Sequence, residues 1–268
     1  MIIKYFTINL DNAVERRKHM QLQATKWGLD IHFFSAVTPD TMAGVRHEYD
    51  AKRTRYHIGR GLAPTELACG LSHLELWRQL EKDEEADAYV IFEDDVLIEA
   101  DLNCLLKKIK LDRIQLLKLA NTWCCKGYEV RDLVQEFKLL RLFKTSEGAT
   151  AYLLHKKECK QIIEFCQNFR KPIDTLIDDY SLFKIKAFSI YPYPVKVIHN
   201  ADLDTPFSSS LEHDRHTFKS APMSKMNRFA YRALRRKWRL HKQFLYMLFR
   251  LRCFVFRRSW LKYPGVLS

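Results

Sequence analysis

Hydrophobic and polar positions at the start of the chain follow a strand–helix–strand order. Residues 2–10 are rich in β-branched and aromatic side chains, which is typical of a strand. From Ala13 to Trp27 apolar residues recur at helical spacing, and Gly28 is a suitable C-cap. Residues 31–35 predict a second strand, so the chain opens with a β-α-β unit.

The pattern continues to residue 198. Residues 88–92 form an apolar run that predicts a strand buried on both faces. Residues 39–64 are polar and predict a long loop, and residues 81–87 predict an acidic connector. Further strands are expected at 115–119, 139–143, 149–154 and 195–198, and helices at 67–80, 156–168 and 175–184. Alternating strands and helices place the chain in the α/β class.

The net charge of +13 is concentrated at the C-terminal end. Residues 217–268 contain 14 Lys or Arg, 11 aromatic residues and no Asp or Glu, whereas residues 1–216 contain 31 basic and 32 acidic residues. We therefore divide the chain into a body, 1–216, and a basic aromatic tail, 217–268. The tail predicts amphipathic helices on an anionic membrane surface. Nucleic acid is the alternative, but no nucleic-acid-binding signature is present and no such partner is expected.

Targeting signals and cysteine spacing give little information about function. The N-terminal residues do not have the pattern of a secretory signal, and no uncharged apolar run predicts a transmembrane helix. The seven cysteines show no CxxC pair or zinc spacing, so reduced thiols are expected.

Three acidic residues, Glu93, Asp94 and Asp95, follow directly after the apolar strand at 88–92. A capped turn would explain them, but in open α/β sheets ligands bind beyond the carboxyl ends of the strands. Adjacent carboxylates repel one another, and a divalent cation would remove that cost. Carboxylate ligands suit Mg²⁺ or Mn²⁺ held together with phosphate oxygens. The cluster therefore predicts a metal–diphosphate site, for which a nucleotide sugar is the natural ligand.

Several motifs together resemble glycosyltransferase family 25, which comprises bacterial lipooligosaccharide sugar transferases, mostly galactosyltransferases, and relatives that glycosylate collagen. The resemblance covers about residues 2–211. The motifs are INLD at 8–11, ERR at 15–17, LAPTELACGLSHLELW at 62–77, VIFEDDV at 90–96, EGATAYLLH at 147–155 and PID at 172–174. Any one of them is weak evidence, but all occur in the same order.

The resemblance implies a GT-A fold, that is, a Rossmann-like mixed sheet flanked by helices, with a DxD-type motif at residues 93–95. Asp95 would be the principal metal ligand, and Glu93 would face the ribose or share the metal. Asp94 is grouped with the nucleotide-binding residues. Asn9 and Leu10 would line the uracil and ribose pocket. His199 is a further candidate metal ligand.

Other donor-site candidates come from residue chemistry. Arg16 or Arg17 is suited to binding the diphosphate, although an exposed helix face would also explain both. Glu66 and Ser72 are expected near the donor, and His73 is expected to be structural. Gly148 would let the backbone approach a ligand closely.

The family is inverting, so the mechanism needs a general base remote from the metal. Asp174, the acid of the PID motif, is the expected base, and a helix N-cap is its structural alternative. Asp178 and Asp179 are rivals.

The resemblance implies a Mn²⁺- or Mg²⁺-dependent hexosyltransferase that moves galactose from UDP-galactose to lipooligosaccharide at the cytoplasmic face of a Gram-negative inner membrane. A UDP-glucose-dependent enzyme of the same architecture is one alternative. The other is a non-catalytic nucleic-acid- or membrane-binding protein on a transferase fold.

Overall fold

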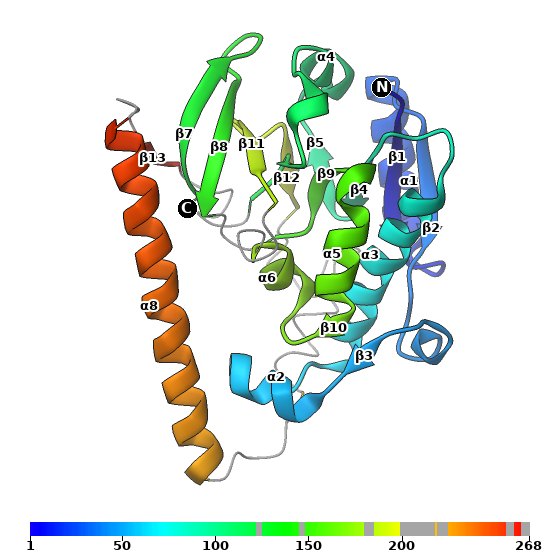
Figure 1. The fold of residues 1–268 in the computed structure, drawn as a ribbon. Helices are drawn as coiled ribbons and strands as arrows, with labels where there is room; N and C mark the ends of the chain where they lie inside the picture. The colour runs from blue at the N-terminus through cyan, green and yellow to red at the C-terminus, as the bar shows by residue number, and fades with distance from the viewer. Residues whose placement is uncertain are drawn as a thin grey trace.

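The computed structural model describes residues 1–121, 125–144, 148–179, 185–198, 218, 225–255 and 260–263 (Figure 1). Its main feature is a nine-stranded sheet with the strand order β13-β7-β8-β11-β6-β9-β4-β1-β2. In chain order these strands are β1 (Ile3–Asn9), β2 (Ile31–Ser35), β4 (Ala88–Glu93), β6 (Leu116–Lys118), β7 (Cys125–Asp132), β8 (Lys138–Lys144), β9 (Ala151–His155), β11 (Ala187–Tyr191) and β13 (Trp260–Tyr263).

Two small sheets and the helices complete the described structure. β3 (Glu48–Tyr49) pairs with β10 (Asn168–Phe169), and β5 (Val96–Ile98) pairs with β12 (Val195–Val197). The α-helices are α1 (Val14–Trp27), α2 (Ala51–Ile58), α3 (Pro64–Lys82), α4 (Leu102–Lys107), α5 (Cys159–Cys166), α6 (Ile173–Ile177) and α8 (Lys225–Val255). Short 3-10 turns lie at Met42–Gly44, Leu111–Arg113 and Lys156–Glu158.

Strand direction determines which side chains meet at one edge of the sheet. β1 runs parallel to both β2 and β4, and β9 lies antiparallel between β4 and β6. β6 is therefore parallel to β4, and it is also parallel to β11. The carboxyl ends of β1, β2, β4 and β6 consequently lie at the same edge, together with the start of β9.

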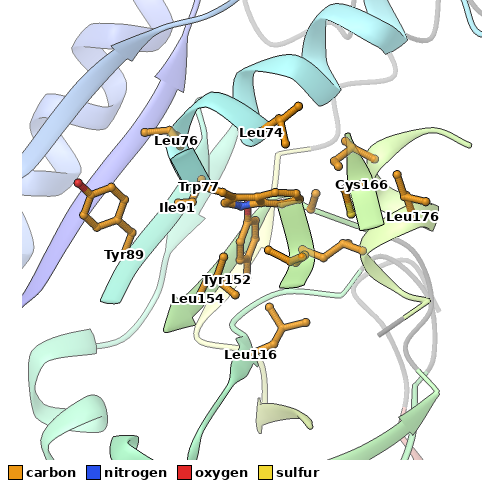
Figure 2. Packing of buried hydrophobic residues seen from close by; sticks show 14 of the residues in the cluster. Leu74, Leu76, Trp77, Tyr89, Ile91, Leu116, Tyr152, Leu154, Cys166 and Leu176 are labelled. Atoms are coloured by element: carbon orange, nitrogen blue, oxygen red, sulfur yellow. The ribbon is translucent and has the colours of Figure 1, made fainter. Parts of the chain in front are cut away.

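Each face of the sheet is covered by helices. α3, α5 and α6 cover one face, where the fully buried Trp77 and Tyr152 pack among leucines from both layers (Figure 2). α1 and α4 contribute Met20, Leu102 and Leu105 to the other face. Because both faces are covered, the central strands are apolar on both sides. The mixed sheet flanked by helices confirms the predicted α/β class.

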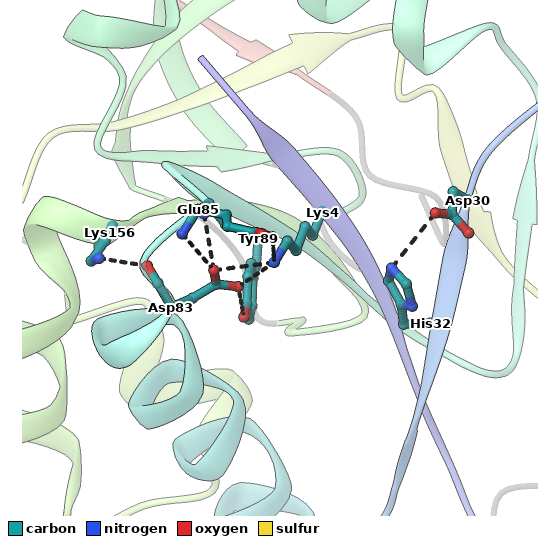
Figure 3. A network of polar contacts seen from close by, with 8 residues as sticks. Lys4, Asp30, His32, Asp83, Glu85, Tyr89 and Lys156 are labelled. Atoms are coloured by element: carbon teal, nitrogen blue, oxygen red, sulfur yellow. Dashed lines mark hydrogen bonds and ion pairs between the residues drawn. The ribbon is translucent and has the colours of Figure 1, made fainter.

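A polar network holds the connection between α3 and β4 against β1 (Figure 3). Asp83 accepts hydrogen bonds from Lys4 Nζ at 3.0 Å and from the Tyr89 hydroxyl at 2.6 Å. Its backbone oxygen accepts a bond from Lys156 Nζ at 2.6 Å. Lys4 also pairs with Glu85 at 3.0 Å. These contacts join the start of β4 to β1 and to the turn after β9.

The strands predicted in the body are all present, with shifts at their ends. The predicted helix at 67–80 is longer, because Pro64 occupies its first turn and Glu66 accepts a bond from the backbone N–H of Ala63. The helix predicted at 175–184 begins earlier, at Ile173, and ends at Ile177; residues 180–184 lie outside the described residues.

The long loop predicted at 39–64 is wrong. This segment contains β3 and α2, and Asp50 caps α2 by accepting bonds from the backbone N–H groups of Lys52 and Arg53. The polar composition of this segment did not indicate a helix, because α2 is stabilised by capping and by tertiary contacts. β5, α4, β7 and β11 were also not predicted.

In its described residues the basic aromatic tail contains one long helix and a strand. α8 runs along one side of the molecule from beside α2, and β13 then pairs antiparallel with β7 (Figure 1). The Tyr231 ring lies against Gly59 at the end of α2. Tyr246 and Phe249 stack near Phe143 of β8, with ring centroids 5.2 and 4.6 Å away. Within the described ranges, no helix is both long enough and apolar enough to span a membrane.

Candidate active site

Asp94 is the best-partnered acid of the cluster at the end of β4. Its Oδ2 accepts a bond from Asn9 Nδ2 at 2.7 Å, and its Oδ1 pairs with Arg16 Nη1 at 2.7 Å. Asn9 reaches Asp94 because β1 and β4 are parallel neighbours with Ile8 opposite Glu93. Asp94 therefore positions one side chain from the end of β1 and one from the first turn of α1.

Asp95 lacks comparable partners. Its Oδ1 is buried and has no hydrogen-bond partner within the described part of the chain. Burial, together with the neighbouring Glu93 carboxylate, raises the pKa of Asp95 to about 7. Arg16 opposes this shift without cancelling it. A buried oxygen without a partner, in a group that resists ionisation, fits a ligand for a divalent cation, which would supply the missing positive charge.

Glu93 faces His73 of α3. The Glu93 Oε1 and His73 Nε2 atoms are 3.6 Å apart, and His73 is completely buried. The backbone N–H of Glu93 donates to Thr150 O at 2.8 Å, which links the cluster to the start of β9. Glu93 is thus directed toward α3, whereas Asp94 is directed toward β1 and α1.

A pocket of about 190 Å³ opens beside the cluster. Its walls come from the ends of β1 and β4, residues 36–39 after β2, and one side of α3. The predicted residues that line it are Leu10, Arg16, Ser72, Glu93, Asp94 and Asp95. Ser72 Oγ accepts a bond from the backbone N–H of Val37 at 2.9 Å, so it also joins two of the walls.

The two candidate arginines have different surroundings. Arg16 lines the pocket while paired with Asp94. Arg17 is exposed, and its guanidinium lies 4.3 Å from the centre of the Phe33 ring on β2. The structure therefore favours Arg16 as the residue that meets a ligand, while Arg17 makes a cation–π contact with the sheet.

Glu66 has a structural function. Its side chain is fully buried, and both carboxylate oxygens receive hydrogen bonds from Arg60 at 2.5 and 2.7 Å. One of them also accepts the backbone N–H of Ala63 at 2.9 Å. Donor binding by Glu66 stays a prediction, and these contacts explain its presence without a ligand.

A buried lysine joins Gly148 to Asp178. Lys118 is completely buried at the end of β6; its Nζ donates to the backbone oxygen of Gly148 and lies 3.3 Å from Asp178 Oδ1. Gly148 has a φ of 117°, a conformation that favours glycine. The glycine is thus explained by its backbone geometry, and its oxygen faces Lys118.

The three aspartates proposed as bases lie on and just after α6. Asp174 is in the first turn rather than at the N-cap, which is Pro172, and its Oδ1 accepts the backbone N–H of Thr175 at 2.6 Å. Asp178 is the C-cap residue and pairs with Lys118. Asp179 is buried and pairs with Lys171 at 2.5 Å. His199 lies outside the described residues.

Two features of this site were not predicted from the sequence. Lys118 was included in a core strand, although a single lysine in an apolar run indicates a buried charge with a specific partner. Cys69 was not considered, yet it lines the pocket one helical turn before His73. The four-residue spacing of Cys69 and His73 places both side chains on the same face of α3, and this spacing could have been read from the sequence.

The raised pKa of Asp95 predicts how the free energy of unfolding depends on pH. Because the pKa of Asp95 rises from 3.8 to about 7 on folding, the folded state retains a proton that the unfolded state has lost between these values. In metal-free buffer the free energy of unfolding should therefore fall as pH rises from 4 to 7. Asp95→Asn should remove this decline and raise the free energy of unfolding at pH 8 by on the order of 2 kcal/mol.

Urea unfolding from pH 4 to 8 would measure the effect, and the exposed Asp40→Asn is the control. Mn²⁺ at pH 8 should stabilise the unmodified protein more than Asp95→Asn. Parallel pH profiles for the two proteins, or equal stabilisation by Mn²⁺, would contradict the prediction.

Comparisons with known proteins agree with this geometry. The model of "Glycosyltransferase family 25 (LPS biosynthesis protein)" matches residues 2–177. A Haemophilus influenzae protein is 26% identical over 217 residues, which cover 78% of this chain and 76% of that protein. The lipooligosaccharide biosynthesis protein lic2B of Haemophilus influenzae is 23% identical over 224 residues, covering 75% of this chain and 81% of that protein.

Solved structures resemble the chain more remotely. A Drosophila beta-1,4-galactosyltransferase 7 in complex with manganese, UDP-Gal and xylobiose is 10% identical, covers 84% of this chain and 82% of its own, and has a TM-score of 0.37. The family match spans the β-α-β opening, α3, the acidic cluster and α6 up to Ile177. The mixed sheet flanked by helices is compatible with the architecture expected from the family resemblance. The chain is a glycosyltransferase and belongs to glycosyltransferase family 25.

Proposed function

We propose that this chain is an inverting, divalent-metal-dependent hexosyltransferase that moves galactose from UDP-galactose to lipooligosaccharide. The observation that carries the proposal is the buried Asp95 oxygen, which has no described partner and lies in a carboxylate cluster lining a pocket. The lipooligosaccharide acceptor is supported by the family description and by the name of the lic2B relative. The metal and the donor sugar are proposed from the chemistry of the site.

Asp95 and Glu93 are the proposed ligands of Mn²⁺ or Mg²⁺, since hard cations prefer carboxylate oxygens. A cation bound there would neutralise negative charge on the diphosphate leaving group. Arg16 lines the same pocket and is suited to a diphosphate oxygen. Asp94 would act indirectly, because its two oxygens hold Asn9 and Arg16 in place.

The contacts of α6 support Asp174 as the general base. The cluster reaches this helix through Thr150, Gly148 and Lys118, which pairs with Asp178 at the end of α6. Asp178 is already engaged in an ion pair with the buried Lys118. Asp174 is half-buried and lies in the first turn of this helix. It would accept the proton of the acceptor hydroxyl during direct displacement.

Removing the Asp95 carboxylate should abolish transfer. With Mn²⁺ and UDP-galactose, we expect Asp95→Ala to lower kcat/KM by about a hundredfold or more, because the leaving-group charge would be left uncompensated. Product formation on lipooligosaccharide would be measured, with Asp132→Ala, an exposed acid on β7, as the control. Transfer that is unaffected by chelation or by Asp95→Ala would contradict a metal-dependent mechanism. Replacing UDP-galactose with UDP-glucose tests the donor.

The two acids of α6 should respond differently to substitution. Asp174→Asn should eliminate transfer while UDP binding, measured by calorimetry, and stability are retained. Asp178→Asn should lower the free energy of unfolding by about 3 kcal/mol, because Lys118 would remain buried without its carboxylate. Normal transfer by Asp174→Asn would exclude it as the base and leave Asp178 and Asp179 as the candidates.

We further propose that α8 holds the enzyme on an anionic membrane, at the cytoplasmic face of the bacterial inner membrane. Tyr231, Tyr246 and Phe249 face the body. An apolar stripe on another side of the helix is exposed, with spacings of four and three residues that keep it on one face. The stripe consists of Leu240, Phe244, Met247, Leu251 and Phe254. Leu248 and Val255 lie next to it, and the exposed fractions of all seven residues range from 42 to 82%.

Charge distinguishes between possible occupants of this stripe. Its spacing would also suit a coiled coil, but the residues beside it include Arg239 and Arg250, and the tail contains no acid. Two copies would therefore bring like charges together, whereas anionic headgroups would neutralise them. Exposed Leu and Phe side chains are suited to an acyl boundary and not to a nucleic-acid backbone.

Polar substitution of the stripe should weaken vesicle binding. The double variant Phe244→Ser, Leu251→Ser should bind vesicles of phosphatidylethanolamine and phosphatidylglycerol about tenfold or more weakly in sedimentation assays. Leu22→Ser, on the 72% exposed Leu22 of α1, is the control. Unchanged vesicle binding by the double variant, or tighter binding of the unmodified protein to duplex DNA than to vesicles, would contradict the proposal.

A further inference from the structure

A thiol, an imidazole and a carboxylate meet on the wall of the pocket. The ligand atoms of Cys69, His73 and Glu93 all lie within 4.8 Å of one another. Cys69 and His73 are four residues apart on α3, so their side chains project from the same helix face. Glu93 approaches from the end of β4. Three groups that can bind a metal ion thus lie together, and the imidazole and the carboxylate are not hydrogen-bonded to each other.

The spacing of His73 and Glu93 is that of two ligands around one ion. Their facing atoms are 3.6 Å apart, too far for a hydrogen bond, and His73 Nε2 is buried without a hydrogen-bond partner in the described structure. Zinc–nitrogen and zinc–oxygen bonds of about 2.0–2.2 Å at a tetrahedral angle separate two ligands by roughly 3.3–3.6 Å. The observed separation of 3.6 Å therefore matches the spacing of two ligands of one zinc ion.

The other nitrogen of His73 is held as metal-binding imidazoles usually are. His73 Nδ1 lies 2.9 Å from the Tyr152 hydroxyl, which accepts a bond from Trp77 Nε1 at 2.8 Å. All three side chains are fully buried, and Figure 2 shows Trp77 and Tyr152 packed together. The ring of His73 is thus fixed with Nε2 directed at Glu93, before any ion arrives.

We propose that Cys69, His73 and Glu93 form a Zn²⁺ site, which shares Glu93 with the oxygen-only site proposed around Asp95. A sulfur, a nitrogen and an oxygen ligand select a borderline-soft ion such as Zn²⁺ over Mn²⁺ or Mg²⁺. Cys69 and Glu93 line the pocket, so the fourth coordination position opens into it. Zn²⁺ bound here withdraws Glu93 from the donor and inhibits any reaction that needs it. The site itself requires neither the donor nor the acceptor of the proposed function.

Cobalt substitution in the full chain tests the site directly. Co²⁺ bound through a thiolate absorbs in the near ultraviolet, and Zn²⁺ displaces it without absorbing. We expect one equivalent of Co²⁺ to give this band, Zn²⁺ to remove it, and Cys69→Ser to weaken Co²⁺ binding at least tenfold. Cys104→Ser, which alters an exposed cysteine elsewhere, is the matched control and should retain the band.

Two further variants separate the possible outcomes. His73→Gln should also lose the band, with circular dichroism used to confirm its fold; Asp95→Asn should keep it, because Asp95 is not a ligand. A band that survives in Cys69→Ser, or that disappears in Asp95→Asn, overturns the proposal. Since no sugar nucleotide is present, failure here leaves the transferase proposal intact, and inactivity with UDP-galactose leaves the zinc site intact.

Discussion

Repulsion among three adjacent carboxylates at the end of β4 is the constraint on which the pocket depends. The fold resolves it differently for each acid. The charge of Asp94 is neutralised by Arg16 of α1, and Asn9 of β1 donates a hydrogen bond to it. Glu93 is turned toward the imidazole of His73 on α3. Asp95 has a buried oxygen without a described partner, and burial together with the Glu93 carboxylate raises its pKa. A cation that binds there would relieve this repulsion, and the free energy released would strengthen its binding.

Buried polar groups also hold the pocket in one arrangement. The buried charge of Lys118 would be costly if it had no partners. The backbone oxygen of Gly148 accepts a hydrogen bond from Lys118, and Asp178 forms an ion pair with it. The Tyr152 hydroxyl likewise lies between His73 and Trp77. Apolar packing could tolerate small shifts between α3, α6 and the sheet, whereas these directional contacts cannot. The position of α6 relative to the acidic cluster is therefore specified by a few atoms.

Local patterns predicted the central strands and the acidic cluster, because a fully apolar run has few alternatives to a buried strand. Partners distant in sequence were not predictable in this way. Nothing near Arg17 indicates that it turns toward Phe33 while Arg16 turns toward Asp94. Nothing near Glu66 in the sequence pattern indicates that Arg60 pairs with it. β7 was missed because its second half, Glu129–Asp132, is exposed on both faces and carries charged residues.

The position of β13 has a consequence for biosynthesis and for truncation. β13 covers the outer side of β7, but it follows α8 and is the last described element of the chain. A growing chain therefore leaves β7 with unpaired backbone groups until the basic helix has emerged from the ribosome. Unpaired strands of this kind promote association between chains. Truncation before β13 would expose that strand, so α8 and the segment after it cannot be removed without also uncovering β7.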